Sequence, residues 1–372
     1  MLLRRLLLTS VFTIATVACS NAEDASTRQM YQRYGNAQGA GAPVTRAAPQ
    51  ISQPVYENTT RTQNDVGGFD HWLHNFRKRA AGQGLQPGFL SSALGGIEYK
   101  PRVIELDGKQ PENKITFQQY KKNIVSQKRI TDGRKYLSQH HALLNRVSKQ
   151  YGVPPQYIVA LWGIETNFGA NTGGFDTLSA LATLAYEGRR ASFFENEFIK
   201  ALKIMQGGHA GTDRLTGSWA GAMGQCQFMP SSYLRYGADG DGDGNINIWS
   251  NLPDVFASTA NYLKTEGWNP YLRWGRAVTA PATIADSLYG RETKKPLSYW
   301  AAQGVKLPGG KPLPVTRETA DLLASLVAPD GPGTETYLVY QNYNVIMHWN
   351  RSTYFATSVG LLADAIANGP AR

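Results

Sequence analysis

Hydrophobic residues recur at helical spacing along much of the chain. Apolar side chains fall at positions i, i+3, i+4 and i+7 within Phe69–Phe76, and the same spacing continues from Tyr136 to Tyr151. Because this spacing gathers side chains on one face, both segments are predicted to be amphipathic helices. The pattern and its terminal signals predict further helices at about 154–168, 176–187, 193–206, 231–236, 253–266 and 352–367.

Two regions depart from the helical pattern. Residues 270–315 are rich in Pro, Gly and Lys and are predicted to form loops and short strands, whereas Thr334–Tyr340 is a β-type run. The chain is therefore predicted to be mainly α-helical, in the α+β class. We expect an N-terminal helical region at 67–137, a core at 138–275, a small β-containing region at 276–340 and a C-terminal helix completing the core at 341–372.

The start of the chain is typical of an export signal. A basic beginning precedes an apolar stretch from Leu6 to Ala18, and Cys19 follows it. Residues 1–18 are therefore predicted to be a signal peptide. The residues before Cys19 resemble the lipobox of bacterial lipoproteins, in which that Cys is lipidated; a plain secretory signal cleaved nearby is the alternative. Residues 19–66 are polar and Gly/Pro-containing without a sustained period, so we expect a flexible tether.

Charge and cysteine usage agree with export. The formal net charge of +10 falls to +8 when the predicted signal, with Arg4 and Arg5, is removed. A positive charge favours polyanionic partners. Outside the cytoplasm we expect no nucleic acid, whereas peptidoglycan stem peptides and anionic lipids are available. Cys226 then has no second Cys with which to form an internal disulfide. No later segment offers the ~20 uninterrupted apolar residues of a transmembrane helix.

One acidic residue interrupts an apolar helix face. Prolines at its start and Gly169 at its end bound a predicted helix over Gln156–Phe168. Its apolar stripe includes Leu161 and Trp162, and the next member of that stripe is Glu165. Burial and the negative end of the helix dipole both raise a carboxyl pKa, which is what a general acid requires. The alternative is a core Glu neutralised by an Arg or a backbone donor.

A second segment has the composition of a binding-cleft wall. Residues 217–232 interleave Gly and Ala with amides, hydroxyls and aromatics. Small residues let the backbone approach a polar ligand closely. Taken alone, the same segment also fits a Gly-rich turn without a ligand.

These motifs together carry a family resemblance. Trp162–Gly169, Gly217–Gly224 and Gln227–Ser232 are similar, in order and spacing, to the membrane-bound lytic murein transglycosylase B family, glycoside hydrolase family 103. The similarity extends from about Phe69 to the C-terminus. It implies a lysozyme-like helical core with an N-terminal helical region and a small strand-containing insertion.

The resemblance also implies a reaction. In that family the Glu of the matching segment, here Glu165, is the single catalytic acid/base. It protonates the β-1,4 oxygen between N-acetylmuramic acid and N-acetylglucosamine, the substrate's acetamido group stabilises the oxocarbenium-like centre, and the muramyl 6-hydroxyl closes a 1,6-anhydro ring. Most glycosidases use two carboxylates, and substrate-assisted enzymes are the exception. The sequence leaves open a second carboxylate from the acidic cluster Glu187, Glu195 and Glu197, although solvated helix faces are the expected reading.

Two other functions remain open at this point. A muramidase on the same scaffold would release reducing muramic acid ends, because the outcome depends on whether the cleft positions or excludes water. A non-catalytic peptidoglycan-binding lipoprotein would use the same groove as a scaffold, and Glu165 argues against it.

The resemblance implies further site residues, which are Ser218, Gln227, Arg189, Arg190, Tyr120, Tyr262 and Asn350. The Ser and Gln would hydrogen-bond the saccharide, the Arg pair would contact stem-peptide or lactyl carboxylates, and the two Tyr would be cleft aromatics. From the residues alone, the Arg pair fits an exposed surface and each Tyr fits a core. The chain departs from the family at three positions: Trp349 and Phe355, which replace Tyr and are held as cleft walls, and Cys226, which replaces a smaller residue.

An acidic loop follows the wall. Residues 239–250 place Asp at positions 1, 3 and 5 and Gly at position 6 of an EF-hand-like calcium loop, but Ser250 stands at position 12 instead of Glu. The resemblance implies that Asp254 closes the loop. The candidate Ca²⁺ ligands are Asp239, Asp241, Asp243, Asn245 and Asp254. A plain Asp/Gly turn is the alternative. We expect a structural Ca²⁺, no organic cofactor, a periplasmic protein anchored to the outer membrane, and cell-wall synthesis complexes as candidate partners.

Overall fold

The structure is a computed structural model that describes residues 66–108, 115–208 and 215–368. The predicted signal peptide, the lipidation site Cys19 and the tether up to residue 65 lie outside the described residues. Among the helices described, none combines the length and the apolar character needed to cross a bilayer.

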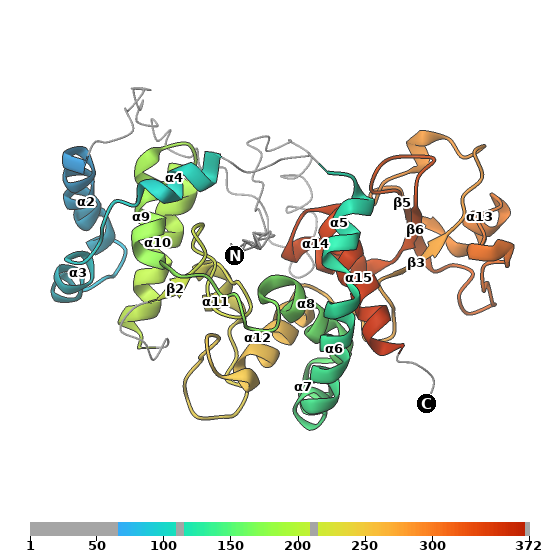
Figure 1. The fold of residues 1–372 in the computed structure, drawn as a ribbon, viewed down its shortest axis with the longest axis horizontal. Coiled ribbons are helices and arrows are strands. Elements are labelled where there is room, and N and C mark those ends of the chain that lie inside the picture. Colours follow the sequence, from blue (N-terminus) through green and yellow to red (C-terminus); the bar gives the residue numbers. More distant parts are fainter. Residues whose placement is uncertain (1–65, 109–114, 209–214, 369–372) are drawn as a thin grey trace, which may run out of the picture. The chain divides into compact units, whose positions relative to one another are not determined.

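Helices make up most of the described chain (Figure 1). The first half contains α2 (Val66–Ala81), α3 (Pro87–Leu94), α4 (Pro101–Gly108), α5 (Phe117–Ile124), α6 (Gln127–Gln139), α7 (His141–Tyr151), α8 (Pro155–Thr166), α9 (Thr177–Glu187) and α10 (Ala191–Gln206). The second half contains α11 (Pro230–Tyr236), α12 (Leu252–Thr265), α13 (Leu297–Ala302), α14 (Gln341–Trp349) and α15 (Thr353–Ala367), with short 3₁₀ turns η1 (Asp286–Leu288) and η2 (Pro308–Gly310). The mainly helical class is as predicted.

The N-terminal helix α2 packs through aromatic rings onto the paired helices α9 and α10, which lie side by side in Figure 1. Phe76 stacks on Phe198 with ring centroids 4.5 Å apart, and Phe69 meets Tyr186 edge-on at 5.4 Å. The predicted stripe of Phe69–Phe76 is thus the face that α2 buries. Such aromatic pairs stabilise a fold by about 0.5–1.5 kcal/mol beyond the area they bury.

Helix α8 lies at the centre of the core. It contacts α6, α7, α12 and α15, and every residue from Tyr157 to Ile164 is buried. A helix that is apolar on all sides belongs in a protein interior. The predicted single apolar stripe was therefore too narrow, since α8 is enclosed on nearly all its faces.

The strands form two sheets. β1 (Phe175–Asp176) pairs with β2 (Thr216–Gly217), whereas β3 (Gly275–Val278), β4 (Lys295–Pro296), β5 (Leu323–Val327) and β6 (Thr336–Val339) form an antiparallel sheet in the order β3-β6-β5-β4. The larger sheet has its own buried cluster, which includes Trp300, Leu326 and Leu338. The strand at 334–340 was predicted, whereas β5 and the helix α13 were not.

Two side chains from the connection between β5 and β6 tie this sheet to α5. Asp330 accepts the backbone N–H of Phe117 at 2.8 Å, at the start of α5, and also accepts the hydroxyl of Tyr354. Glu335 forms an ion pair with Lys121 on α5. The insertion therefore holds one end of the helix that carries Tyr120.

One predicted helix is interrupted, and one helix was not predicted. The segment 136–151 divides into α6 and α7 at His140, whose φ of −105° and ψ of 20° leave the helical region. The helix predicted at 352–367 is α15, whereas the separate helix α14 before it was not predicted. Asn350 Oδ1 accepts the N–H of Ser352 at 3.0 Å, and Ser352 Oγ caps the new helix by accepting the N–H of Phe355. Side-chain capping of this kind starts a helix afresh.

The packing of α15 generates a stability prediction. A Cβ added at Gly360 would overlap the indole of the fully buried Trp274. Gly360→Ala is expected to lower the free energy of unfolding by about 1–3 kcal/mol through overpacking. Gly88→Ala in α3 is the matched control, because its Cβ would meet nothing within 4 Å. Urea unfolding checks both variants, and equal effects of the two would contradict the described packing.

Candidate active site

Glu165 lies in the last turn of α8, and the residue keeps part of its surface exposed, unlike its neighbours along the helix, although its carboxyl group is closely surrounded by protein atoms. The helix ends at once after it, because Asn167 and Phe168 adopt left-handed backbone angles with φ of 51° and 60°. Such angles in non-glycine residues are uncommon and cluster at functional sites. The chain therefore turns sharply beside the carboxyl group.

One side chain donates a hydrogen bond to Glu165. The indole Nε1–H of Trp349, at the end of α14, donates to Oε1 over 2.8 Å. The Trp349 ring packs against Tyr262 and Phe228, with centroids 4.6 Å and 5.3 Å away. Trp349 was predicted only as a cleft wall, and the structure gives it a direct contact with the carboxyl group.

Burial shifts the titration of Glu165. It raises the pKa of Glu165 to about 8, while the hydrogen bond from Trp349 opposes this rise. The negative end of the helix dipole acts in the same direction as burial. Among the described residues no second carboxylate contributes to the shift. At neutral pH the side chain is therefore largely protonated, as a general acid must be.

The segment 217–228 forms a folded wall next to α8. Isolated antiparallel bridges join Met223 to Gly217 and to Phe228. Gln225 fastens the wall to the helix, because its Oε1 accepts the indole N–H of Trp162 at 2.7 Å and its backbone carbonyl accepts Thr166 Oγ1. We had assigned no role to Gln225 from the sequence. The sequence offered no signal that separates this amide from the neighbouring amide of Gln227.

With this geometry established, comparison with known proteins decides the family. Residues 68–364 match the family described as Transglycosylase SLT domain. The chain belongs to this family. The predicted family and the lysozyme-like, mainly helical fold are confirmed.

Relatives in two bacteria support the assignment. Membrane-bound lytic murein transglycosylase B of Escherichia coli (strain K12) is 36% identical over 251 residues, which are 67% of this chain and 66% of that protein, just under two thirds of its length. SltB3 from Pseudomonas aeruginosa in complex with NAG-NAM-pentapeptide is 39% identical with a TM-score of 0.77, covering 81% of this chain and 80% of that one. Escherichia coli lytic transglycosylase Slt35 in complex with calcium is 30% identical with a TM-score of 0.66, covering 82% and 93%.

The transglycosylase wall places Ser218 and Gln227 within a hydrogen-bonded turn. Ser218 Oγ accepts the N–H of Ala222 at 3.1 Å. Gln227 has a φ of 50°, and its Nε2 donates to the carbonyls of Thr172 and Gly224. Ser218 is thus held within the wall, and Gln227 is held by the wall and by Thr172; their contacts with saccharide remain predictions.

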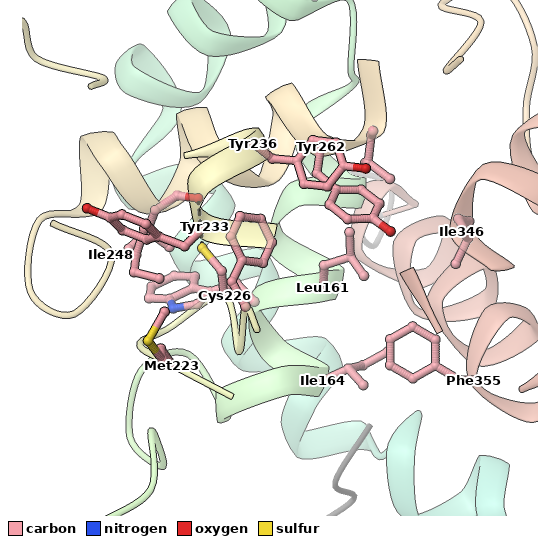
Figure 2. Close-up of a cluster of buried hydrophobic side chains, with 14 of the residues drawn as sticks. Leu161, Ile164, Met223, Cys226, Tyr233, Tyr236, Ile248, Tyr262, Ile346 and Phe355 are labelled. Atoms are coloured by element: carbon pink, nitrogen blue, oxygen red, sulfur yellow. Dashed lines mark hydrogen bonds between the residues drawn. The ribbon is translucent and has the colours of Figure 1, made fainter. Parts of the chain in front are cut away.

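The aromatic residues divide into two groups. Tyr262 and Trp349 lie against each other, and the negative charge of Glu165 helps to raise the pKa of Tyr120, although burial contributes more. Phe355, predicted as a cleft wall, is instead in the core, where Figure 2 shows it facing Ile164. Both predicted tyrosines therefore lie near the Glu165 carboxyl group, whereas Phe355 packs in the core.

Asn350 and Cys226 serve the surrounding structure. Asn350 is buried and directs the chain from α14 into α15 through its bond to Ser352. Cys226 is buried beside Met223 and Tyr233 (Figure 2), and burial raises the pKa of its thiol to about 12. Its sulfur lies 3.4 Å from the carbonyl of Val255. The larger atom at this position is accommodated by contact with α12.

The Arg pair is bound to an acidic partner. Arg190 Nη2 donates to Asp107 Oδ1 at 2.7 Å, and Arg189 donates to Oδ2 of the same residue. Asp107 is buried, whereas the side chain of Arg189 is 54% exposed. Sequence reasoning missed this Asp in α4. Recognition of substrate carboxylates by the Arg pair stays a prediction.

The acidic cluster was only partly interpreted correctly. Glu195 pairs with Arg79 at 2.8 Å near the surface, but Glu197 is buried with 2% of its surface exposed. Its Oε2 accepts the N–H of Ser231 at 2.8 Å, at the start of α11. The expectation of a solvated face is wrong for Glu197, because the carboxylate satisfies an orphan backbone donor at a helix N-terminus.

Three acidic side chains converge where the loop before α12 meets the first turn of that helix. Asp239, Asp241 and Asp254 offer carboxylate oxygens that lie within 4.8 Å of one another. Asp254 is fully buried, and burial together with the charges of Asp241 and Asp239 raises its pKa. Asp243 lies outside this group of acidic residues and accepts the N–H of Asn245. Oxygen ligands gathered in this way suit Ca²⁺.

A cavity of about 380 Å³ lies beside β3 and β6, and its walls include Tyr289, Thr334 and Glu335. Glu165 and Trp349 are not among its lining residues. Cavity volume alone does not identify a reaction centre, so we assign the site from the perturbed carboxyl group.

The raised pKa of Glu165 predicts a pH-dependent effect on stability. In the unfolded chain the carboxyl titrates near its ordinary 4.5, whereas in the folded chain it titrates near 8. The folded state therefore loses stability as pH rises between these values. Glu165→Gln is expected to stabilise the protein by about 2–4 kcal/mol at pH 9 and little at pH 4.5.

Urea unfolding at both pH values measures this difference. Glu292→Gln is the control. The side chain of Glu292 is 82% exposed, so this substitution removes the same charge from an exposed position. Equal stability changes in the two variants at pH 9 would contradict the buried, protonated state of Glu165.

Proposed function

We propose that this protein is a lytic transglycosylase that cleaves the β-1,4 bond between N-acetylmuramic acid and N-acetylglucosamine in peptidoglycan, with Glu165 as its single acid/base. The observation that carries the proposal is one protonated carboxyl group beside a wall typical of the family. SltB3, at 39% identity, was solved with NAG-NAM-pentapeptide, which supports the substrate class.

The first step requires an acid. Glu165 donates its proton to the glycosidic oxygen as the bond breaks, and the resulting carboxylate is stabilised by the N–H of Trp349. The positive charge that develops at the muramyl carbon is met by the substrate's own acetamido oxygen. No second protein carboxylate is then needed.

The second step returns the proton. The Glu165 carboxylate removes the proton from the muramyl 6-hydroxyl, whose oxygen attacks the anomeric carbon and closes the 1,6-anhydro ring. Glu165 regains its proton, and the protein ends the cycle in its starting state. A carboxyl pKa of about 8 suits both directions of transfer near neutral pH.

The remaining predicted residues complete the cleft. We propose that Ser218 and Gln227 hydrogen-bond the saccharide near the scissile bond, and that sugar rings pack on Tyr120 and Tyr262. Arg189 and Arg190 contact stem-peptide or lactyl carboxylates in exchange for part of their bonding to Asp107. Asn350 shapes the site through the turn that follows Trp349.

We also propose that the protein works in the bacterial envelope, attached through a lipid on Cys19 to the outer membrane. The relative in Escherichia coli is described as membrane-bound, which supports this location. Peptidoglycan strands are the partner, and cell-wall synthesis complexes are further candidates.

A structural Ca²⁺ belongs to the proposal. The carboxylates of Asp239, Asp241 and Asp254 repel one another when they are charged, and a divalent cation relieves this repulsion. Slt35 was solved in complex with calcium, which supports the same ion here. Asp243 and Asn245 are the remaining candidate ligands. No organic cofactor is proposed.

The reaction is tested by the products released from purified sacculi. Mass spectrometry of the soluble muropeptides is expected to find 1,6-anhydromuramyl ends with the wild-type protein. Reducing ends would identify a muramidase, and no release would leave a non-catalytic binding protein.

Glu165→Gln is expected to keep glycan affinity and to lower the cleavage rate by at least about a thousandfold, because the amide keeps the shape but cannot exchange the proton. The same digestion measures the rate, and sedimentation with sacculi measures binding. Cleavage by this variant at the wild-type rate would exclude Glu165 as the acid.

Calcium removal generates a separate prediction. A chelator is expected to lower the melting temperature of the calcium-loaded protein by about 5 °C, because the ion binds only the folded state. Asp241→Asn should melt lower in calcium and respond less to chelator, whereas Asp286→Asn, in η1, should respond as the wild type does. An unchanged transition in calcium-loaded wild-type protein would count against the site.

A further inference from the structure

The two oxygens of Glu165 are not equivalent. Oε1 accepts the hydrogen bond from the indole N–H of Trp349 over 2.8 Å. An indole nitrogen can donate a hydrogen bond but cannot accept one. Oε1 therefore faces a permanent donor in both protonation states of the carboxyl group. A proton on Oε1 would make that oxygen a weaker acceptor for the indole N–H, so the contact favours protonation of Oε2.

The indole is held in this orientation by packed aromatic rings. Trp349 lies 4.6 Å from Tyr262 and 5.3 Å from Phe228, measured between ring centroids. Tyr262 in turn packs 4.3 Å from Tyr236. Rotation of the indole away from Glu165 would open voids in this stack, so the donor stays directed at Oε1.

We propose that Trp349 is a positioning residue that reserves Oε2 of Glu165 as the oxygen that gives and takes the catalytic proton. The inference rests on the proposed acid/base function of Glu165. It adds that one defined oxygen performs both transfers, so the glycosidic oxygen and the muramyl 6-hydroxyl must meet the carboxyl group from the same side.

The same contact lowers the pKa of Glu165, and with it the highest pH at which Glu165 can act as an acid. A donor to the carboxylate stabilises its charged form, so it opposes the effect of burial. The other titratable groups around Glu165 stay neutral meanwhile, because burial raises the pKa of Tyr120 on α5, of Tyr262 on α12 and of Cys226 in the wall. Burial lowers the pKa of Arg129, whose charge acts on Tyr120.

Trp349→Phe tests the proposal by kinetics, because it removes the N–H and keeps an aromatic ring. The alkaline limb of the kcat/KM profile is expected to move upward by about one pH unit, and kcat to fall about tenfold as the carboxyl group loses its fixed orientation. A purely structural role would lower activity and leave the limb in place.

Trp249→Phe is the matched control. Trp249 is also a partly buried indole whose N–H donates over 2.8 Å, but its acceptor is the backbone carbonyl of Thr216. Its loss is expected to leave the alkaline limb unchanged. Equal shifts in both variants, or no shift with Trp349→Phe, would overturn the proposal.

A second measurement does not depend on activity or on the folding of the Phe variant. In ¹H–¹⁵N spectra of wild-type protein, one indole resonance is expected to move with a midpoint near the Glu165 pKa of about 8. The movement should vanish in Glu165→Gln, where Trp349 binds the amide carbonyl and the amide nitrogen occupies the reactive position. If no indole resonance follows Glu165, the positioning role is wrong. Failure of the wild-type protein to cleave sacculi would instead refute the proposed function. The indole resonance could still be measured in that case, so the two failures are distinguishable.

Discussion

The proposed chemistry depends on the burial of the Glu165 carboxyl group without a basic residue to form an ion pair with it. Helix α8 is enclosed by α6, α7, α12 and α15, and Glu165 is the one acidic residue in a helix that has no basic residue. Its hydrogen-bond donor is the neutral indole of Trp349 and not a cationic side chain. An Arg or Lys there would hold the carboxylate charged and remove its capacity to act as an acid.

The elements around this helix serve mainly to fix its surroundings. Gln225 connects α8 to the wall, and the acidic loop leads from that wall region to α12, which carries Tyr262. The four-stranded sheet holds α5, the helix of Tyr120, through Asp330 and its neighbours. A site built on packed helices, with its wall hydrogen-bonded to them, loses little conformational entropy when a rigid glycan binds.

The sequence predicted the parts of the fold that depend on local periodicity. The helices around Glu165 and the strand at 334–340 follow from spacing, proline positions and glycine ends. Spacing also placed Glu165 on an apolar face but left a neutralised core Glu as the alternative, and the family resemblance supplied its catalytic role. Long-range pairings were not predictable in this way. The partner of the Arg pair is Asp107, which lies 82 positions before Arg189, and no local signal connects the two. Helix α14 was also not predicted, and its separation from α15 depends on side-chain hydrogen bonds of Asn350 and Ser352. The contact of Trp349 with Glu165 was not predicted, because the two residues lie 184 positions apart and no local signal shows that the indole N–H reaches the carboxyl group.

The most direct test of the central claim is the titration of the Glu165 carboxyl carbon by ¹³C NMR, with Glu165→Gln used to identify the resonance. A midpoint near pH 8, well above those of exposed glutamates, is the result that burial predicts. A midpoint near the ordinary 4.5 would show a carboxyl group that is charged at neutral pH, and the single-acid account would then be wrong.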